Sequence, residues 1–241
     1  MLRNKSQSGN VFVFILLGVF LFGALIFTFT KSGQQGNSAL TKQQTKIIAQ
    51  DILNYAQNLE RAVQKVRRNG CSESQINFNN SVIAGYSNTN APVDGSCDIF
   101  GINGGNMEWQ DPPSGASNYA NYEILNNAGV EGIGPNSGFT DAAVDLVMVL
   151  VELDQNVCKS INENVGIDLE AGNIPRDSGD LVDVAFPGRY TGSFNFVNAI
   201  SDSDNNCNGM NGDDFCGKPT GCFHELGGSQ YYVFYHALLG R

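Results

Sequence analysis

The sequence predicts an α+β fold in which a long N-terminal helix packs on a small antiparallel sheet, with one further buried helix and long disulfide-held loops. Three observations predict it. Val11–Thr30 is an apolar run without charge or proline. A helical hydrophobic repeat then occupies residues 38–68. Beyond Gly70, short β-rich runs alternate with Gly, Asn, Ser and Pro, and all six cysteines lie in this part.

The apolar run Val11–Thr30 is long enough to cross a bilayer. At about 1.5 Å per residue, it spans roughly the 30 Å hydrocarbon core as a helix. The leader, residues 1–9, carries Arg3 and Lys5 and no acid. The positive-inside rule therefore keeps the leader in the cytoplasm and places the chain after residue 31 outside. We expect residues 10–30 to be a retained anchor, because the run exceeds a signal-peptide core and no A-x-A site follows it.

A polar hinge and an amphipathic helix are expected next. Residues 31–37 contain two glycines, each of which disfavours a helix by about 1 kcal/mol relative to alanine. From Ser38, apolar residues recur at spacings of four and three, and Gly70 is a suitable stop, so the helix is assigned to residues 38–70. Its apolar stripe consists of Ile48, Ile52, Tyr55, Leu59, Ala62 and Val66. This face packs on its own domain, contacts neighbouring subunits, or does both.

Charge separates the two parts of the chain. Residues 1–70 contain nine Lys/Arg and two Asp/Glu, whereas residues 71–241 contain five Lys/Arg and 22 Asp/Glu. Nucleic-acid surfaces need clustered basic residues, so the balance argues against a nucleic-acid partner. We therefore interpret residues 71–241 as one acidic, extracytoplasmic globular α+β domain.

Within this domain, short strands and loops are expected up to residue 139, at SQINF, SVIAGY, CDIF, NMEWQ and NYEIL. Trp109 is either a strand residue that caps the core or an exposed binding spot. A second, largely buried helix is expected to begin at Thr140 and to continue through VDLVMVLVELD, with Cys158 and Ile161 on its apolar face. Strands are expected over residues 181–186 and 192–200.

A β-hairpin is expected at the end of the chain, over Cys222–Leu239. Leu226–Ser229 would form its turn. His224 and His236 would then face one another across the hairpin. With Glu225 they could bind a metal, or they are ordinary surface residues.

The cysteines indicate disulfides in an oxidising compartment, because their number is even and they are confined to the outer side. A thiolate metal site is the alternative, but the chain has no CxxC and only two histidines. Cys71–Cys97 is the preferred pair, and Cys158 is expected to fasten its helix to another element. The six cysteines are Cys71, Cys97, Cys158, Cys207, Cys216 and Cys222.

The first 70 residues resemble the type IV pilin and type II secretion pseudopilin superfamily. The shared features are a short basic leader ending in glycine, an apolar helix that begins directly after it, and an amphipathic continuation. The resemblance implies that a prepilin peptidase cuts between Gly9 and Asn10, and that Val11–Thr30 first anchors the subunit and then packs into a filament core. The family's usual glutamate at the fifth mature position is replaced here by Phe14. An ordinary single-pass anchor is the other interpretation.

An acidic loop near the C-terminus is a candidate calcium site. Oxygen donors are dense on the Gly/Asn-rich segment 201–214, and calcium takes six to eight oxygens. The resemblance implies such a loop too, although the spacing is not that of an EF-hand. The alternative is a solvated loop held by Cys207 and Cys216. The candidate ligands are Asp202, Asp204, Asn206, Asp213 and Asp214.

No catalytic motif is found, so we do not expect an enzyme: G-x-S-x-G, H-E-x-x-H, P-loop and Rossmann patterns are missing from the sequence. The first hypothesis is a pilin- or pseudopilin-like subunit. It would assemble with copies of itself or related subunits through Val11–Thr30, in the bacterial inner membrane or an extracellular filament. The second is an unprocessed, single-pass binding module, such as an adhesin or accessory factor. An anchored envelope enzyme is the third.

Overall fold

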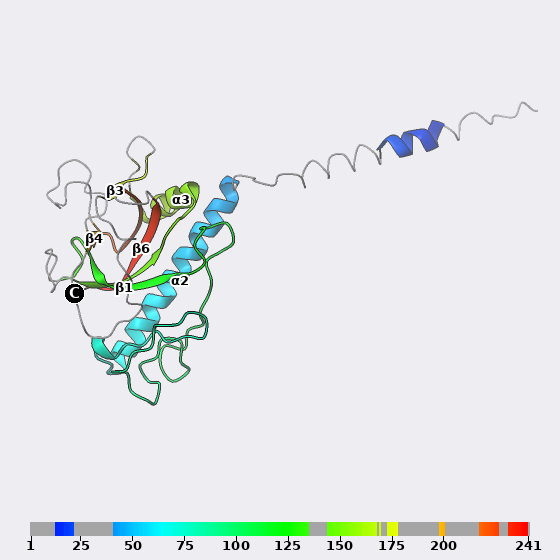
Figure 1. Cartoon of the computed structure of the whole chain (residues 1–241). Helices are drawn as coiled ribbons and strands as arrows, with labels where there is room; N and C mark the ends of the chain where they lie inside the picture. Colours follow the sequence, from blue (N-terminus) through cyan, green and yellow to red (C-terminus); the bar gives the residue numbers. More distant parts are fainter. Residues whose placement is uncertain are drawn as a thin grey trace, which may run out of the picture. The chain divides into compact units, whose positions relative to one another are not determined.

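The computed structural model describes residues 13–21, 41–134, 144–167, 169, 173–177, 198–200, 217–226 and 231–240. The chain divides into two compact units, Met1–Thr41 and Lys42–Arg241. The second unit contains helices as well as a sheet, as the predicted α+β class requires (Figure 1). The predicted leader, hinge and strand over residues 181–186 lie outside the described residues, as does most of the predicted strand over residues 192–200.

The helix of the first unit covers residues 13–21. It is a portion of the predicted membrane span Val11–Thr30, and the rest of that run lies outside the described residues. Of the helices in the described part of the chain, none has both the length and the apolar character needed to cross a bilayer.

Helix α2, Lys42–Arg68, confirms the predicted amphipathic helix. Its stripe is buried as expected, with Ile52 and Leu59 fully inaccessible to solvent, whereas Ile47 beside the stripe is 62% exposed. The helix ends where the sequence predicts, because Gly70 adopts a φ of 99°, a left-handed conformation that glycine reaches without a Cβ penalty.

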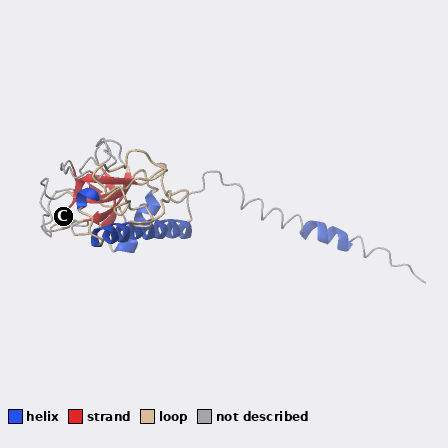
Figure 2. Cartoon of the chain, turned by 90° about the horizontal axis from the view of Figure 1, so that it is seen from below, coloured by secondary structure: helices blue, strands red, loops and turns tan. Residues whose placement is uncertain are grey.

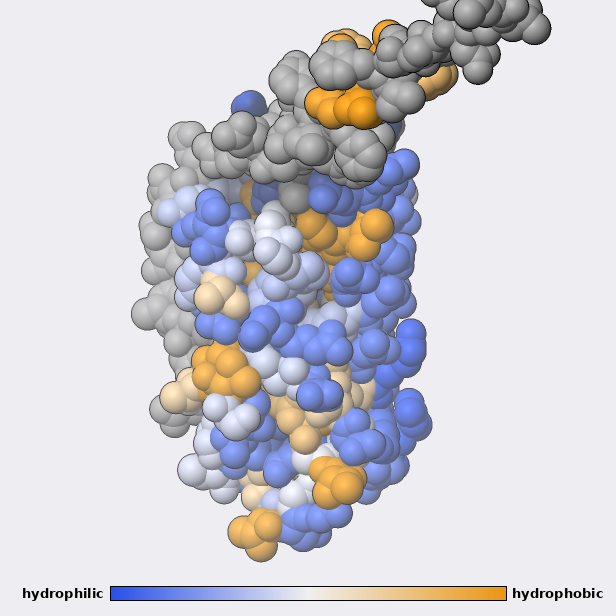
Figure 3. Space-filling view, turned by 90° about the vertical axis from the view of Figure 1, so that its right-hand side faces the viewer, coloured by the Kyte–Doolittle hydropathy of each residue, from blue (hydrophilic) through white to orange (hydrophobic). Residues whose placement is uncertain are grey.

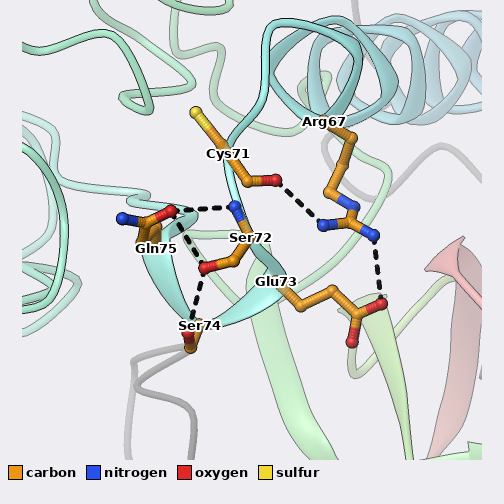
Figure 4. A network of polar contacts seen from close by, with 6 residues as sticks. All are labelled: Arg67, Cys71, Ser72, Glu73, Ser74 and Gln75. Carbon is orange, nitrogen blue, oxygen red and sulfur yellow. Dashed lines mark hydrogen bonds and ion pairs between the residues drawn. The ribbon is translucent and has the colours of Figure 1, made fainter.

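A polar network follows the end of α2 (Figure 4). Arg67 donates to the Cys71 carbonyl at 2.9 Å and forms an ion pair with Glu73 at 3.3 Å. Ser72 and Gln75 form a capping box around the short 3₁₀ helix η1, Glu73–Gln75. Arg67, one of three basic residues in the last turn of α2, thus binds oxygens of the segment that follows the helix, and its positive charge suits a helix C-terminus.

Within the described residues, the sheet has six strands in the order β3-β5-β6-β2-β1-β4. The four central strands are antiparallel, and the edge strands β3 and β4 run parallel to their neighbours. The β5–β6 hairpin confirms the predicted one. The strands are β1 Glu123–Val130, β2 Asp145–Leu150, β3 Arg176–Asp177, β4 Asn198–Ile200, β5 Thr220–Glu225 and β6 Tyr232–Leu239.

The predicted helix through VDLVMVLVELD is wrong. Asp145–Leu150 is strand β2, buried at every position, and a shorter helix, α3, covers Gln155–Val165. A short, continuous apolar run fits a buried strand as well as a buried helix, and its valines favour the strand. Helix α3 instead begins at Asp154, whose carboxylate accepts from the amides of Asn156 and Val157.

Both helices pack on one face of the sheet. Thr220 pairs with His236, and Cys222 pairs with Phe234, so these four side chains share a face. His236 contacts α2, and Cys222 is bonded to Cys158 of α3. Figure 2 shows α2 beside the strands. The opposite face is also buried, by a cluster that includes Leu125, Val147, Val149, Phe223, Val233 and Tyr235.

Long loops occupy most of the segment between α2 and β1. Of the predicted short strands there, only NYEIL enters a strand, at the start of β1; Asn77 and Asp98 form an isolated bridge. Trp109 lies half-buried in a loop, so its predicted strand position is wrong.

Tyr55 of α2 stacks on Tyr122 with ring centroids 4.9 Å apart. Burial raises the pKa of the Tyr55 hydroxyl to about 12, so it stays protonated at neutral pH.

Two disulfides connect these parts. Cys71–Cys97 confirms the preferred pair and ties the end of α2 to the loops. Cys158–Cys222 confirms that Cys158 fastens its helix, here α3, to strand β5. Cys207 and Cys216 lie outside the described residues.

Removing either disulfide by paired Cys→Ala substitution should destabilise the fold, and the Cys158–Cys222 loss should cost more. The bonds close loops of 26 and 64 residues. Loop-closure entropy gives a loss of about 3.5 kcal/mol for the shorter loop and about 4.3 kcal/mol for the longer one. Urea unfolding followed by far-ultraviolet circular dichroism measures both. A larger loss for Cys71–Cys97 would contradict this ranking.

Candidate functional site

The helix over residues 13–21 presents apolar side chains in every direction. Consecutive residues on a helix are separated by 100°, so the eight apolar side chains of residues 13–21, which are interrupted only by Gly18, are distributed around its whole circumference. The exposed fractions include 69% for Phe14, 58% for Leu17 and 77% for Phe20. A continuous apolar surface of this kind is unfavourable in water, which makes it a candidate interaction surface.

The second unit exposes its apolar side chains differently. On the face shown in Figure 3, small apolar patches are separated by polar residues. Val82, Val93 and Ile102 are exposed, at 55%, 107% and 83%. Isolated exposed apolar residues are normal on a soluble surface. The continuous apolar surface on residues 13–21 is therefore the stronger candidate for an assembly site.

Phe14 gives this helix its particular chemistry. It stands where the resembled family has a carboxylate, and the described helix around it carries no charged residue. A glutamate in an apolar environment needs a cationic or hydrogen-bonding partner. A phenylalanine needs only apolar contact, so this helix can pack in lipid or against another helix without a matching charge.

A second candidate site is a partly buried polar chain between α2 and the sheet, whose carboxylate end reaches solvent. The His236 Nε2 atom lies 3.2 Å from Glu60 Oε2, and His236 Nδ1 is hydrogen-bonded to the Thr220 hydroxyl. Because a carboxylate only accepts, the Nε2 atom carries a proton toward Glu60, and the Nδ1 atom shares the second hydrogen bond with the Thr220 hydroxyl. The hydrogen bond from His236 lowers the pKa of Glu60, and the charge of Arg61 lowers it further.

The order hydroxyl, imidazole and carboxylate also occurs in nucleophilic catalysts. Here, however, Thr220 is 9% exposed and His236 is 4% exposed. A hydroxyl buried between a sheet and a helix does not meet a substrate. The chain Thr220–His236–Glu60 therefore serves to fix α2 against β5 and β6.

The predicted histidine pair is not formed. The hairpin register places His224 opposite Tyr232 and His236 opposite Thr220. His224 lies one residue from the end of β5, whereas His236 is the fifth residue of β6. The two therefore stand at different distances from the turn and cannot be opposite one another, so the predicted metal site that combined them with Glu225 is wrong in its geometry.

The remaining predicted site residues belong to the leader and to the acidic segment 201–214. Gly9, Asn10 and the candidate calcium ligands Asp202, Asp204, Asn206, Asp213 and Asp214 lie outside the described residues. Within the described ranges, no group of three or more His, Cys, Asp and Glu side chains could hold a metal ion. Calcium binding by segment 201–214 stays a prediction.

The sequence analysis does not predict the Glu60–His236 contact, because no local pattern connects the two residues. The two residues are separated by 176 positions. One signal pointed to His236: it is the only ionisable side chain other than tyrosine in the strand YVFYHALL. Buried polar groups need partners, so this strand required one from outside itself.

Comparison with known proteins finds no matching family model, no similar curated protein and no similar solved structure. Two features of the chain itself bear on its function. They are the apolar helix over residues 13–21 and the compact α+β unit that follows it.

Replacing Glu60 with Gln should lower the free energy of unfolding at pH 7 by up to about 1 kcal/mol, since the carboxylate is partly exposed to solvent. The folded state lowers the pKa of Glu60 below its ordinary value of 4.5, so its contribution is complete above that pH. The contribution disappears as the pH falls through the lower, folded value. Urea unfolding at pH 7 and pH 3 measures the difference.

Asp51→Asn is the matched control, because Asp51 is an exposed carboxylate on the same helix. It should leave stability nearly unchanged at both pH values. If Glu60→Gln lowers the free energy of unfolding as much at pH 3 as at pH 7, the loss of stability is not caused by removing the carboxylate charge.

Proposed function

We propose that this protein is a non-enzymatic structural subunit, pilin- or pseudopilin-like, that assembles through its N-terminal helix. The observation that carries the proposal is the helix over residues 13–21, which is apolar and exposed around its whole circumference. It precedes a separate compact unit with its own buried core. This division suits a protein whose first part is held by lipid or by other helices and whose second part faces water.

Transfer from lipid to a filament imposes a demand that this helix meets. In lipid, the hydrophobic effect does not drive helices together, and association depends on close packing of side chains. A helix apolar on every side can leave the bilayer for a bundle of similar helices without exposing a polar group. The proposed partners are copies of the chain or related pilin-like subunits.

The resemblance of the first 70 residues supports this assignment, including a prepilin-peptidase cut between Gly9 and Asn10. The proposed location is the bacterial inner membrane, with the acidic unit outside the cytoplasm, and then an extracellular filament or a secretion complex. Phe14 in place of a glutamate favours a minor or tip position, since a main subunit of the resembled family carries the acid.

An unprocessed, single-pass binding module is the second candidate. The observation in its favour is also Phe14, because a membrane anchor requires no carboxylate at that position. The two candidates differ in the fate of the leader. A processed subunit loses residues 1–9, whereas a simple anchor keeps Met1.

Mass spectrometry of the protein isolated from membranes should find Asn10 as the new N-terminus, with methylation of its amino group as further support. Cutting after Gly9 removes Arg3 and Lys5, so the charge that fixes the helix end in the cytoplasm is lost and the helix is free to leave the bilayer. An intact Met1 in all molecules would exclude the processed subunit and favour the simple anchor.

Replacing Phe14 with Ala should reduce recovery in sheared extracellular filaments by about fivefold, corresponding to about 1 kcal/mol of lost packing. The helix stays apolar, so the membrane fraction should be unchanged. Val93→Ala is the matched control, because Val93 is an exposed apolar residue of the other unit. Equal recovery of the two variants would contradict assembly through this face of the helix.

A further inference from the structure

A surface pocket of about 430 Å³ lies among the loops between α2 and β1. Two aromatic rings line it, Phe100 and Trp109, with centroids 5.5 Å apart in an edge-to-face arrangement. The carboxylates of Asp98 and Glu108 also line it, and each described charged residue in its wall is acidic. Aromatic rings and carboxylates thus meet at one concave site.

The walls of this pocket are fixed by hydrogen bonds. The side-chain amide of Asn77 donates to Asp98 Oδ1 at 2.6 Å. The backbone of Asn77 also forms two hydrogen bonds. Its N–H donates to the Cys97 carbonyl, and its C=O accepts from the Ile99 N–H. The Cys71–Cys97 disulfide then anchors this pairing to α2. A site held in this way loses little conformational entropy when a ligand binds.

A tight turn keeps Phe100 beside Trp109. Gly105 donates to the Asp98 carbonyl at 2.9 Å, and Met107 donates to the Ile99 carbonyl at 3.2 Å. A Cβ atom on Gly104 would lie 2.2 Å from the Asp98 carbonyl oxygen, so only glycine allows this approach. The chain therefore returns to the same place within a few residues and brings both rings to one pocket.

We propose that this pocket binds an organic cation, an ammonium or guanidinium group, between its aromatic rings and its carboxylates. The face of an aromatic ring attracts a cation, tryptophan most strongly, and carboxylates add to that attraction. A neutral sugar could stack on the rings and donate hydroxyl hydrogen bonds to the carboxylates, but it would gain no charge–charge attraction, which a cation gains in addition. The basic side chains of Arg61 and Lys65 line a neighbouring groove instead.

The charge of the surrounding domain reinforces this preference. Residues 71–241 carry 22 Asp/Glu against five Lys/Arg, and a net negative charge of this size favours the approach of cations to the domain. The cation is either a free quaternary ammonium compound or the Lys or Arg side chain of a partner. This site is independent of the apolar helix and stands or fails separately from the proposed assembly.

Fluorescence measures binding directly, because Trp109 is the only tryptophan in the chain. The full chain is purified in a polyoxyethylene detergent, which carries neither a sugar nor an ammonium headgroup. Choline chloride is titrated against sodium chloride at equal ionic strength. Parallel titrations use a lysine- and arginine-containing peptide, a peptide of the same length with neutral residues at those positions, and N-acetylglucosamine.

Choline or the basic peptide should change the Trp109 emission in a saturable way, and the tighter of the two identifies the source of the cation. The double variant Asp98→Asn/Glu108→Gln should weaken binding at least about fivefold, while keeping an acceptor for Asn77. If the double variant fails to fold, the single variant Glu108→Gln replaces it in the experiment. Glu108→Gln should weaken cation binding by a smaller factor than the double variant. Asp51→Asn, an exposed carboxylate on α2, should bind as the natural protein does.

Three results would overturn the proposal. The first is a change with choline no larger than that with sodium chloride, together with no response to the basic peptide. The second is binding of N-acetylglucosamine or the neutral peptide as tight as that of the cations. The third is unaltered cation binding by the folded double variant.

Discussion

The packing of α2 is the interaction on which the compact unit depends. Its buried stripe contacts the sheet through β6, lies against α3, and supports the loops through the Tyr55–Tyr122 stack. Ile52, Leu59 and Val63 are inaccessible to solvent, so each contributes hydrophobic free energy to more than one neighbour. The Glu60–His236–Thr220 chain adds a directional contact that fixes how the helix lies on the sheet.

This arrangement allows a large irregular segment to keep a defined shape. The loops between α2 and β1 contain little regular structure, yet the Cys71–Cys97 bond ties them to the end of the helix. Buried Asn88 donates to the Ser74 and Ile76 carbonyls at 2.8 Å, and Asn77 bonds to Asp98. Side-chain amides thereby satisfy the backbone groups that strands would otherwise pair. A rigid surface pocket results without a strand to build it.

The sequence predicted the elements whose pattern is long or local. The repeat of α2 covers many turns, the β5–β6 hairpin lies around one turn, and Cys71–Cys97 joins positions near in sequence. Periodicity gave the wrong element at Asp145–Leu150, because a short apolar run fits a strand and a helix equally well. The segment is a strand with both faces buried, so it shows no alternation of apolar and polar residues. The contact of Glu60 with His236 and the pocket at Trp109 depend on tertiary packing, which no local pattern records.

The N-terminal apolar helix is proposed to be an assembly surface. Photo-cross-linking can identify its neighbours, with a photoreactive phenylalanine analogue at Leu17, which is 58% exposed. In cells that make the protein, the account predicts cross-links to the apolar N-terminal helix of another copy or of a related subunit, mapped by mass spectrometry. Cross-links to lipid alone, with no protein adduct under assembly conditions, would contradict it.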